Sequence, residues 1–228
     1  MVAPVPADSC LVHNDWICGQ YYSSRSSDLT SAIQEHLTIV LVSVLLGFVL
    51  AFPLALLARR YRRLEWGVVG TTTAIYTIPS LALFSLLVPL TGLTITTVVI
   101  GLALYSLTVL VRNMLEGLRA VPAEVKESAL GMGYSDTKML LLVELPLALP
   151  AIMAGLRVAT VSAVALTTVG SIVGYGGLGT LLIAGTQSNF KAQVLTTSVL
   201  CVLLAVVLDL LLVGMQRVLT PWARKGTA

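Results

Sequence analysis

The chain has 228 residues, of which 57% are hydrophobic and only 11% are charged, with a net charge of +3. Soluble domains carry about 25% charged residues, so this chain has too few to cover a water-soluble globule. The cations stand in short clusters between apolar runs and form no basic, aromatic-rich surface, which excludes a nucleic-acid groove. The sequence therefore predicts an all-α integral membrane protein.

Residues 1–32 form a polar N-terminal arm that lacks the basic start and apolar core of a secretion signal. The arm holds Cys10 and Cys18, whose spacing does not suit zinc and which no pair of histidines accompanies. A disulfide between them and two free thiols both fit the spacing, and an external arm would favour the disulfide. His13 and His36 are isolated in the sequence, so we expect neither a metal site nor a catalytic histidine.

Five membrane spans are expected after the arm, because about 20 apolar residues cross roughly 30 Å of hydrocarbon. The uncharged stretch that follows the first span is long enough for two helices, with a turn at Pro89 and Gly92. Glycines at 174–179 break the apolar run after the fourth span, and a short outer helix follows. The predicted spans are residues 37–58, 67–90, 94–111, 150–173 and 194–216.

The positions of lysine and arginine predict the orientation of these spans. With the N-terminus outside, only Arg25 and Lys191 are external, and Arg157 lies near the inner end of its span. This asymmetry predicts an external arm and a cytosolic C-terminal tail at residues 218–228. The expected inner cations are Arg59, Arg60, Arg62, Arg63, Arg112, Arg119, Lys126, Lys138, Arg217, Arg224 and Lys225.

The inner segment at residues 112–146 has the pattern of a helix, a glycine turn and a second helix. Pro122 can open the first helix, where its missing N–H would have no partner in any case, and Glu124 suits the helix dipole. Gly131 and Gly133 end that helix. Ser135 or Asp136 can then cap a second helix that runs toward Pro146.

This segment resembles the EAA loop of bacterial ABC importer permeases, which reads Glu-Ala-Ala, three residues, Gly, nine residues and Ile-x-Leu-Pro. The spacing agrees throughout, with serine and valine as conservative departures. The matching positions are Glu127, Ser128, Ala129, Gly133, Val143, Leu145 and Pro146. The resemblance implies that the segment is the coupling helix that docks on an ATPase subunit.

Three further runs, at residues 77–83, 143–155 and 174–179, resemble the glycine betaine/carnitine/choline branch of these permeases. The likeness covers about residues 33–215, and the block 33–217 is the expected permease domain. It implies a type I (MetI-like) importer fold and import of a quaternary ammonium osmolyte.

The resemblance also implies partners for this chain. They are a second permease subunit, identical or homologous, two cytosolic ATPase subunits and a separate extracytoplasmic solute-binding protein. The sequence contains no G-x-x-x-x-G-K-[ST] motif, so we expect no cofactor in this chain and ATP with Mg²⁺ in the partner ATPase. The chain itself is expected to catalyse no reaction and to hold no metal.

Polar and aromatic residues near the middle of the second and third spans are candidates for the translocation pathway. Proline inside a span frees a backbone carbonyl, which is tolerated where helices surround a cavity. Tyrosine rings attract quaternary ammonium cations, although such residues also serve simply in helix packing. The candidates are Tyr76, Thr77, Pro79, Ser80 and Tyr105.

The glycines at 174–179 match G-x-G-x-x-G by letter, but an apolar span precedes them and no acidic residue follows until Asp209. A dinucleotide site needs a strand before the motif and an acidic residue about 20 positions later. We therefore interpret the run as a flexible break where the chain turns within the protein, or alternatively as an outer gate. The gate candidates are Gly174, Gly176, Gly177 and Gly179.

Arg157 and Asp209 are charges inside apolar segments near the inner face. Such groups can serve a pathway directly, or they can pair with each other as a structural ion pair.

Two other functions remain open from the residues. An ion-coupled carrier or channel would show inverted repeats and ionisable groups at the membrane midplane, and neither is visible. A scaffold subunit would form no pathway. An ABC permease for another small zwitterion or an amino acid is the nearest alternative to an osmolyte importer.

Overall fold

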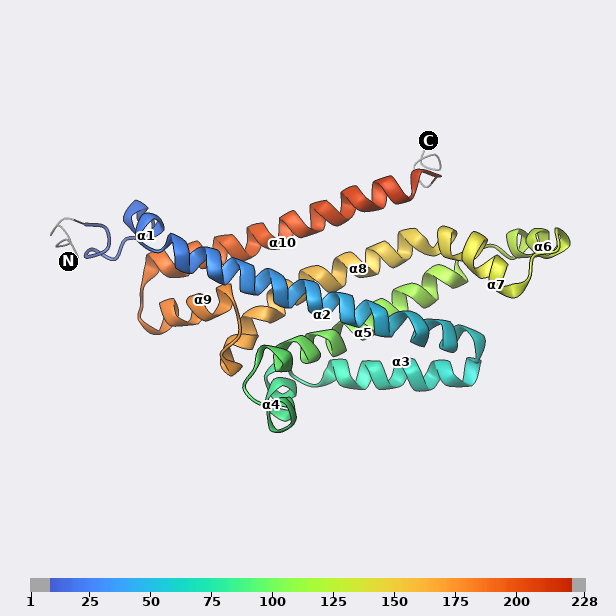
Figure 1. The fold of residues 1–228 in the computed structure, drawn as a ribbon, viewed down its shortest axis with the longest axis horizontal. Helices are drawn as coiled ribbons and strands as arrows, with labels where there is room; N and C mark the ends of the chain where they lie inside the picture. The colour runs from blue at the N-terminus through green and yellow to red at the C-terminus, as the bar shows by residue number, and fades with distance from the viewer. Residues whose placement is uncertain (1–8, 223–228) are drawn as a thin grey trace.

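The computed structural model describes residues 9–222, and these form an elongated, helical molecule (Figure 1). The first eight residues of the arm and residues 223–228 of the tail, with Arg224 and Lys225, lie outside the described residues. The helices are α1 Gly19–Ser24, α2 Ser26–Arg60, α3 Arg62–Thr77, α4 Ser80–Thr91, α5 Ile95–Arg119, α6 Ala123–Gly131, α7 Asp136–Met139, α8 Leu145–Thr167, α9 Leu178–Gln187 and α10 Lys191–Leu219. A π-helical turn, Leu140–Glu144, precedes α8, and a 3₁₀ turn, Thr168–Val173, follows it.

Helix α5 lies at the centre of the bundle and packs against α2, α3, α4 and α8. Its buried face includes Leu110, Val111 and Met114. The crossing with α2 is close because α2 places Gly47 there, where an added Cβ would lie 1.9 Å from the Ser106 hydroxyl oxygen. Small residues that let helix backbones approach are typical of packing between membrane helices.

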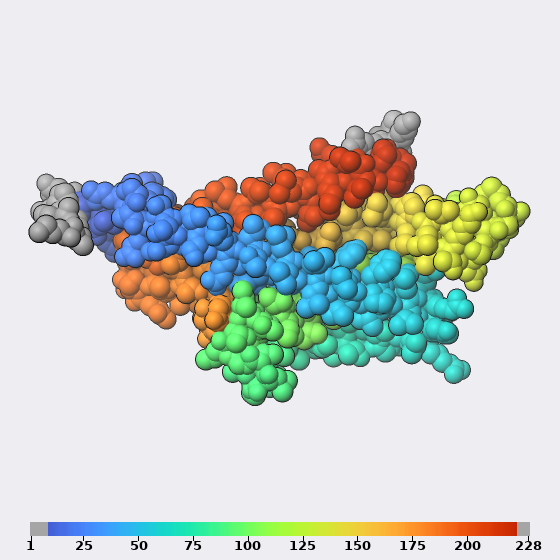
Figure 2. All heavy atoms as spheres, viewed as in Figure 1, coloured from blue at the N-terminus to red at the C-terminus, as the bar shows by residue number. Residues whose placement is uncertain are grey.

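Helix α10 covers one side of the bundle (Figure 2), and about half of its apolar residues are exposed. Val202, Leu210 and Leu211 each expose more than 60% of their surface. An apolar outer face of this extent fits contact with lipid or another membrane helix.

Four of the described helical segments are long and apolar enough to cross a membrane, and a bent pair raises the number to five. Helix α2 has 35 residues, which at about 1.5 Å per residue is about 52 Å, so it extends well beyond the hydrocarbon. The expected fourth span also starts earlier, because a continuous helical segment runs from Asp136 to Val173. Likewise α5 continues past residue 111 to Arg119.

The expectation of a single helix over 67–90 is wrong. The chain bends by 100° between α3 and α4. Pro79 has no N–H to donate and disfavours a helical Ile78, whose ψ is 128°. The segment expected as the second span is thus two helices joined at a sharp bend, and the bend lies beside α5.

Candidate functional site

The α6–α7 hairpin (residues 122–139) projects at one end of the molecule, opposite α1 and α9 (Figure 1). Pro122 stands immediately before α6, and Glu124 lies in the first turn, as the sequence pattern predicts. The Ser128 hydroxyl donates to the Glu124 carbonyl at 2.7 Å, so its hydrogen bond is made within its own helix.

Gly133 ends the first arm of the hairpin in the left-handed region, with φ +80°. Its N–H donates to the Leu130 carbonyl at 2.9 Å, and the Tyr134 N–H donates to the Ala129 carbonyl at 3.1 Å. This pair of bonds is the Schellman arrangement, in which glycine is favoured at the left-handed position. An added Cβ at Gly133 would meet no atom within 4 Å, so backbone conformation alone requires the glycine.

The second arm begins at Ser135, whose hydroxyl oxygen accepts from the Lys138 N–H at 3.4 Å. The chain then runs through α7 and the π-helical turn into α8 without a loop. Leu145 and Pro146 open α8. Because Pro146 cannot donate to the carbonyl four residues earlier, the wider π turn lies at a point where a regular α-helix would lose a bond.

Helix α6 carries most of its side chains outward. Glu127 and Ser128 are exposed, whereas Ala129 is buried with 1% of its surface accessible. Apolar residues next to them are exposed as well: Val125, Leu130 and Met132, the last at 69%. A helix that exposes apolar side chains beside a carboxylate at the tip of a hairpin has the character of a protein contact surface.

Beneath the hairpin lies Glu144, the last residue of the π turn, with no exposed surface. Arg59, near the end of α2, donates to its Oε1 at 2.6 Å. Lys126 of α6 places its Nζ 3.8 Å from the same oxygen. Sequence reasoning missed this residue, and its only visible signal was an acidic side chain next to the Leu-Pro pair.

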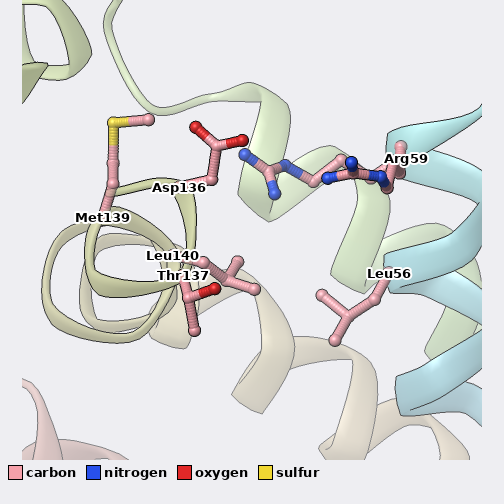
Figure 3. A pocket seen from close by; sticks show the side chains of 7 residues that line it. Leu56, Arg59, Asp136, Thr137, Met139 and Leu140 are labelled. Atoms are coloured by element: carbon pink, nitrogen blue, oxygen red, sulfur yellow. The ribbon is translucent and has the colours of Figure 1, made fainter. Parts of the chain in front are cut away.

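A polar hollow separates the end of α2 from α7 (Figure 3). Arg59 and Arg60 line it on one side, and Asp136, Thr137 and Met139 line it on the other. The end of α2 and α7 are therefore not closely packed at this point.

The pathway candidates gather at the break between α3 and α4, but they do not all share one surface. The rings of Tyr76 and Tyr105 meet edge to face, with centroids 5.8 Å apart. Both line a small pocket between α3, α5 and α8 together with Ser106 and Ser162. Thr77 donates to the Ala74 carbonyl of its own helix.

Three of the five pathway candidates, Thr77, Pro79 and Ser80, do not line this pocket. Ser106 and Ser162, which do line it, were not among the candidates. Ser162 stands in an apolar helix with no pattern to mark it, so only the packing of α8 on α5 reveals its position.

The glycines at 174–179 form a closely packed turn. Gly174 and Gly177 have φ of +86° and +53°. An added Cβ at Gly177 would lie 2.6–2.7 Å from backbone and Cβ atoms of His36, and one at Gly179 would lie 2.3 Å from the Cα of Thr168. The Gly177 N–H donates to a Glu35 carboxylate oxygen at 3.1 Å. The turn therefore fixes the chain between α8 and α9 against α2.

Arg157 and Asp209 face each other across α8 and α10, with N–O distances of 2.7 and 2.9 Å. Two parallel bonds of this kind hold a guanidinium and a carboxylate in a fixed orientation. The pair is partly exposed and joins α10 to the bundle.

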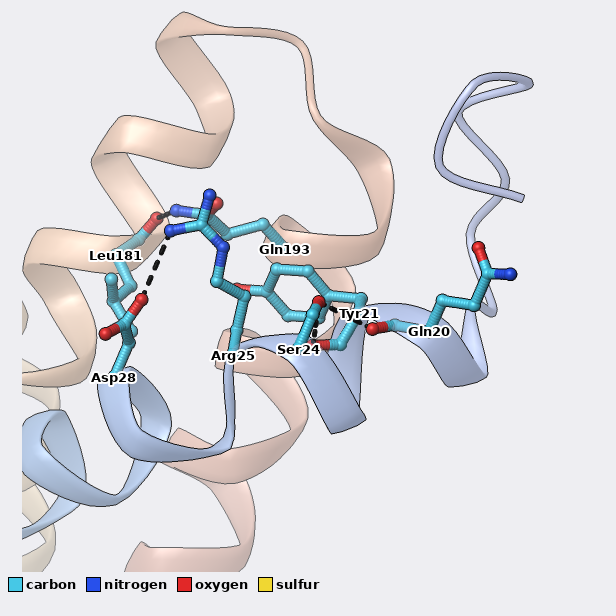
Figure 4. Close-up of polar contacts among 7 residues, drawn as sticks. All are labelled: Gln20, Tyr21, Ser24, Arg25, Asp28, Leu181 and Gln193. Atoms are coloured by element: carbon cyan, nitrogen blue, oxygen red, sulfur yellow. Dashed lines mark hydrogen bonds and ion pairs between the residues drawn. The ribbon is translucent and has the colours of Figure 1, made fainter. Parts of the chain in front are cut away.

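The N-terminal arm is attached to the end of the molecule that carries α9 and α10. Cys10 and Cys18 are joined by a disulfide. Asn14 inside that loop donates to the Asn189 carbonyl at 2.7 Å and accepts from the Lys191 N–H at 2.9 Å. Figure 4 shows the adjoining start of α2, where Arg25 pairs with Asp28 beside Tyr21.

Residues 37–225 match the family described as binding-protein-dependent transport system inner membrane component. The chain is 38% identical over 208 residues to the glycine betaine/carnitine/choline transport system permease protein OpuCD of Bacillus subtilis (strain 168), covering 91% of each chain. It is 36% identical to the choline transport system permease protein OpuBD of the same organism, covering 91% of this chain and 92% of that one.

A third relative is the osmoprotectant import permease protein OsmW of Salmonella typhimurium (strain LT2), 35% identical and covering 88% of this chain and 96% of that one. Among solved structures, an inward-facing MetNI methionine ABC transporter chain aligns with a TM-score of 0.77 at 22% identity. That alignment covers 86% of this chain and 98% of the other, and it supports the expected MetI-like fold.

Proposed function

The chain belongs to the family of binding-protein-dependent transport system inner membrane components, and from this premise we propose that it imports a small quaternary ammonium osmolyte. It is a multi-pass permease subunit of an ABC importer in the bacterial inner membrane, and it is not itself an enzyme. Glycine betaine, choline and carnitine are the proposed solutes because the names of its relatives specify them.

The observation that carries the proposed coupling to an ATPase is the α6–α7 hairpin. The exposed Glu127 and its apolar neighbours offer a docking surface for a cytosolic ATPase. The left-handed backbone of Gly133 sets the angle between the two arms of the hairpin. We assign the EAA positions Glu127, Ser128, Ala129, Gly133, Leu145 and Pro146 to this coupling element. ATP and Mg²⁺ then belong to the partner ATPase.

The proposed orientation places the hairpin in the cytosol and the arm with Cys10 and Cys18 outside. The inner end then holds the arginine cluster where α2 ends and α3 begins, together with Arg112, Arg119, Lys126 and Lys138. A solute-binding protein would approach the outer end near α1 and α9. A second permease subunit, identical or homologous, would complete the pathway.

The residues Tyr76, Tyr105, Ser106 and Ser162 are the proposed solute contacts in a more open conformation of the permease, because the pocket of about 10 Å³ that they line here has room for little more than one water. Tyrosine rings attract a quaternary ammonium group, and each such contact is worth roughly 0.5–2 kcal/mol. The turn with the exposed Gly174 and the buried Gly176, Gly177 and Gly179 lies toward the other end, where it would serve as part of an outer gate.

The test is uptake into proteoliposomes that contain the purified permease, ATPase and solute-binding protein. We expect uptake of labelled glycine betaine, choline or carnitine, and we expect it to require ATP on the side of the membrane where the ATPase is bound. If amino acids inhibit uptake of the transported solute and none of these three solutes does, the proposed substrate class is refuted. Uptake that persists without ATP and collapses with an ion gradient would refute the importer mechanism.

A further inference from the structure

Glu144 is a fully buried carboxylate in a chain where charged groups are few. Carboxylates are almost never fully buried unless they are paired, since desolvation of the ion costs several kcal/mol. Its partners, Arg59 and Lys126, come from two different helices, the end of α2 and the coupling helix α6. One side chain at the start of α8 therefore contacts both.

The burial of this triad is asymmetric. The side chains of Arg59 and Lys126 keep 31% and 30% of their surface exposed, whereas that of Glu144 keeps none. Either cation can thus be hydrated without the carboxylate, but the carboxylate relies on the two cations. The energy of Glu144 consequently depends on where α6 lies relative to α2.

The two contacts also differ in length. Arg59 is within hydrogen-bond distance at 2.6 Å, and Lys126 at 3.8 Å is beyond it. A small movement of α6 can therefore close or lose the Lys126 contact while Arg59 stays bound.

Glu144 ends the π-helical turn from which α8 begins. π turns are irregular points within helices and often occur at functional sites. Farther along α8, Ala159 and Ser162 line the pocket with Tyr76 and Tyr105. A displacement of α6 that reaches Glu144 would therefore act on the helix that lines the pathway pocket.

We infer that Glu144 is a positioning residue for coupling: through Lys126 and Arg59 it transmits the position of the coupling helix to α8 and α2. This inference rests on the proposed function, in which an ATPase moves α6. A purely structural ion pair would instead affect assembly and stability without changing how much solute moves per ATP.

The experiment measures solute imported per ATP hydrolysed by the purified complex in proteoliposomes, using whichever of glycine betaine, choline and carnitine the wild type imports fastest. In Glu144→Gln the shape is kept and the buried charge is removed, and both cations can still reach water. We expect the ATPase to co-purify and hydrolyse ATP, with the import ratio lowered about fivefold or more, the lower range of coupling between sites. Glu144→Asp, which keeps the charge, should restore part of the ratio.

Lys126→Met removes the contact of Glu144 with α6 and serves as the second variant, with co-purification of the ATPase as the check that docking is retained. It should lower the import ratio in the same direction, and combination with Glu144→Gln should add little, because both changes break one link. Glu116→Gln is the matched control, an exposed carboxylate that pairs with Arg119 at 3.7 Å. It should leave the ratio unchanged.

An unchanged import ratio in both Glu144→Gln and Lys126→Met would overturn the inference. If Glu144→Gln does not assemble, Lys126→Met decides: a lowered ratio supports the inference and a wild-type ratio overturns it. Failure of the wild-type complex to couple uptake to ATP would instead refute the proposed function, and with it this inference.

Discussion

The hydroxyl of Tyr105 donates a hydrogen bond to the carbonyl of Ile78, and so joins the middle of α5 to the break between α3 and α4. Pro79 follows Ile78, and the bend leaves the Ile78 carbonyl outside any regular helix. The same tyrosine ring meets Tyr76 in the pocket that we propose for the solute. Tyr105 therefore supports the break with its hydroxyl and faces the pocket with its ring.

These two roles can be separated by substitution. Tyr105→Phe keeps the ring but deprives the Ile78 carbonyl of its donor, which should lower stability by about 1–3 kcal/mol. The proposed solute contact is retained, so uptake per folded complex should fall little. Thermal unfolding in detergent and uptake in the same preparation measure the two effects, and a loss of uptake without a loss of stability would contradict this division.

Removal of the ring at the neighbouring position tests the solute contact. Tyr76→Leu should lower transport efficiency about two- to thirtyfold, the range that one cation–π contact of roughly 0.5–2 kcal/mol gives. Tyr61→Leu is the control, because Tyr61 is exposed at the start of α3 and does not line the pocket. Equal uptake in Tyr76→Leu and the wild type would remove this residue from the pathway.

The glycine turn gives a prediction on stability. Gly177→Ala must place a Cβ within 2.6–2.7 Å of His36 atoms at a positive φ, and part of the clash is with backbone that cannot rotate away. Overpacking of this kind costs about 1–3 kcal/mol, in addition to the strain of the left-handed backbone. Gly174→Ala has the strain without the clash, since its Cβ would meet nothing within 4 Å.

The expected order of melting temperatures is wild type, then Gly174→Ala, then Gly177→Ala. A melting temperature of Gly177→Ala equal to that of Gly174→Ala would mean that α2 does not approach the turn so closely.

The proposed orientation is tested with single cysteines in a chain cleared of Cys10, Cys18 and Cys201. Ser24 lies in the N-terminal arm and Ser135 lies in the hairpin, and both positions are exposed. An impermeant maleimide should label Ser24→Cys in intact cells and Ser135→Cys only after the membrane is opened. The reverse pattern would invert the topology.

The arm disulfide is tested on the unmodified chain. Mass spectrometry of peptides prepared without reductant should recover Cys10 and Cys18 as one linked pair, and Cys201, which has no bonded partner among residues 9–222, as a free thiol. Recovery of Cys10 and Cys18 as free thiols would contradict the bond.

Much of the fold could be predicted because its determinants are local in the sequence. Long uncharged runs mark membrane helices, and Pro122, Gly133 and Ser135 mark the ends of the two hairpin arms. The bend between α3 and α4 was also marked, by Pro79, but hydropathy averages over a window and does not report a bend. The length of the apolar run therefore led to the prediction of one span over residues 67–90, although Pro79 lies within it.

The parts that could not be predicted depend on distant segments coming together. In the sequence, nothing distinguishes Glu144 from the other charged residues near it. Its role becomes visible only in the fold, where α2 and α6 place Arg59 and Lys126 beside it. Ser162 becomes a pocket residue only when α8 packs against α5. Likewise, the approach of Gly177 to His36 joins positions 141 residues apart, and glycine composition alone suggested flexibility at that turn.

The central claim is that α6 and its glycine turn couple this permease to an ATPase, and a pair of glycine variants tests it most directly. Both Gly131 and Gly133 have open space around them, but only Gly133 has a positive φ. Gly133→Val forces a β-branched residue into the left-handed region, which costs about 1 kcal/mol or more and misdirects the second arm. Gly131→Ala lies within α6, where alanine is favoured over glycine by roughly 0.5–1 kcal/mol.

The measurement is co-purification of the ATPase together with solute uptake from the same membranes. Gly133→Val should insert normally but retain little ATPase and little uptake, whereas Gly131→Ala should match the wild type in both. Normal ATPase association and normal uptake in Gly133→Val would show that this hairpin is not the coupling element.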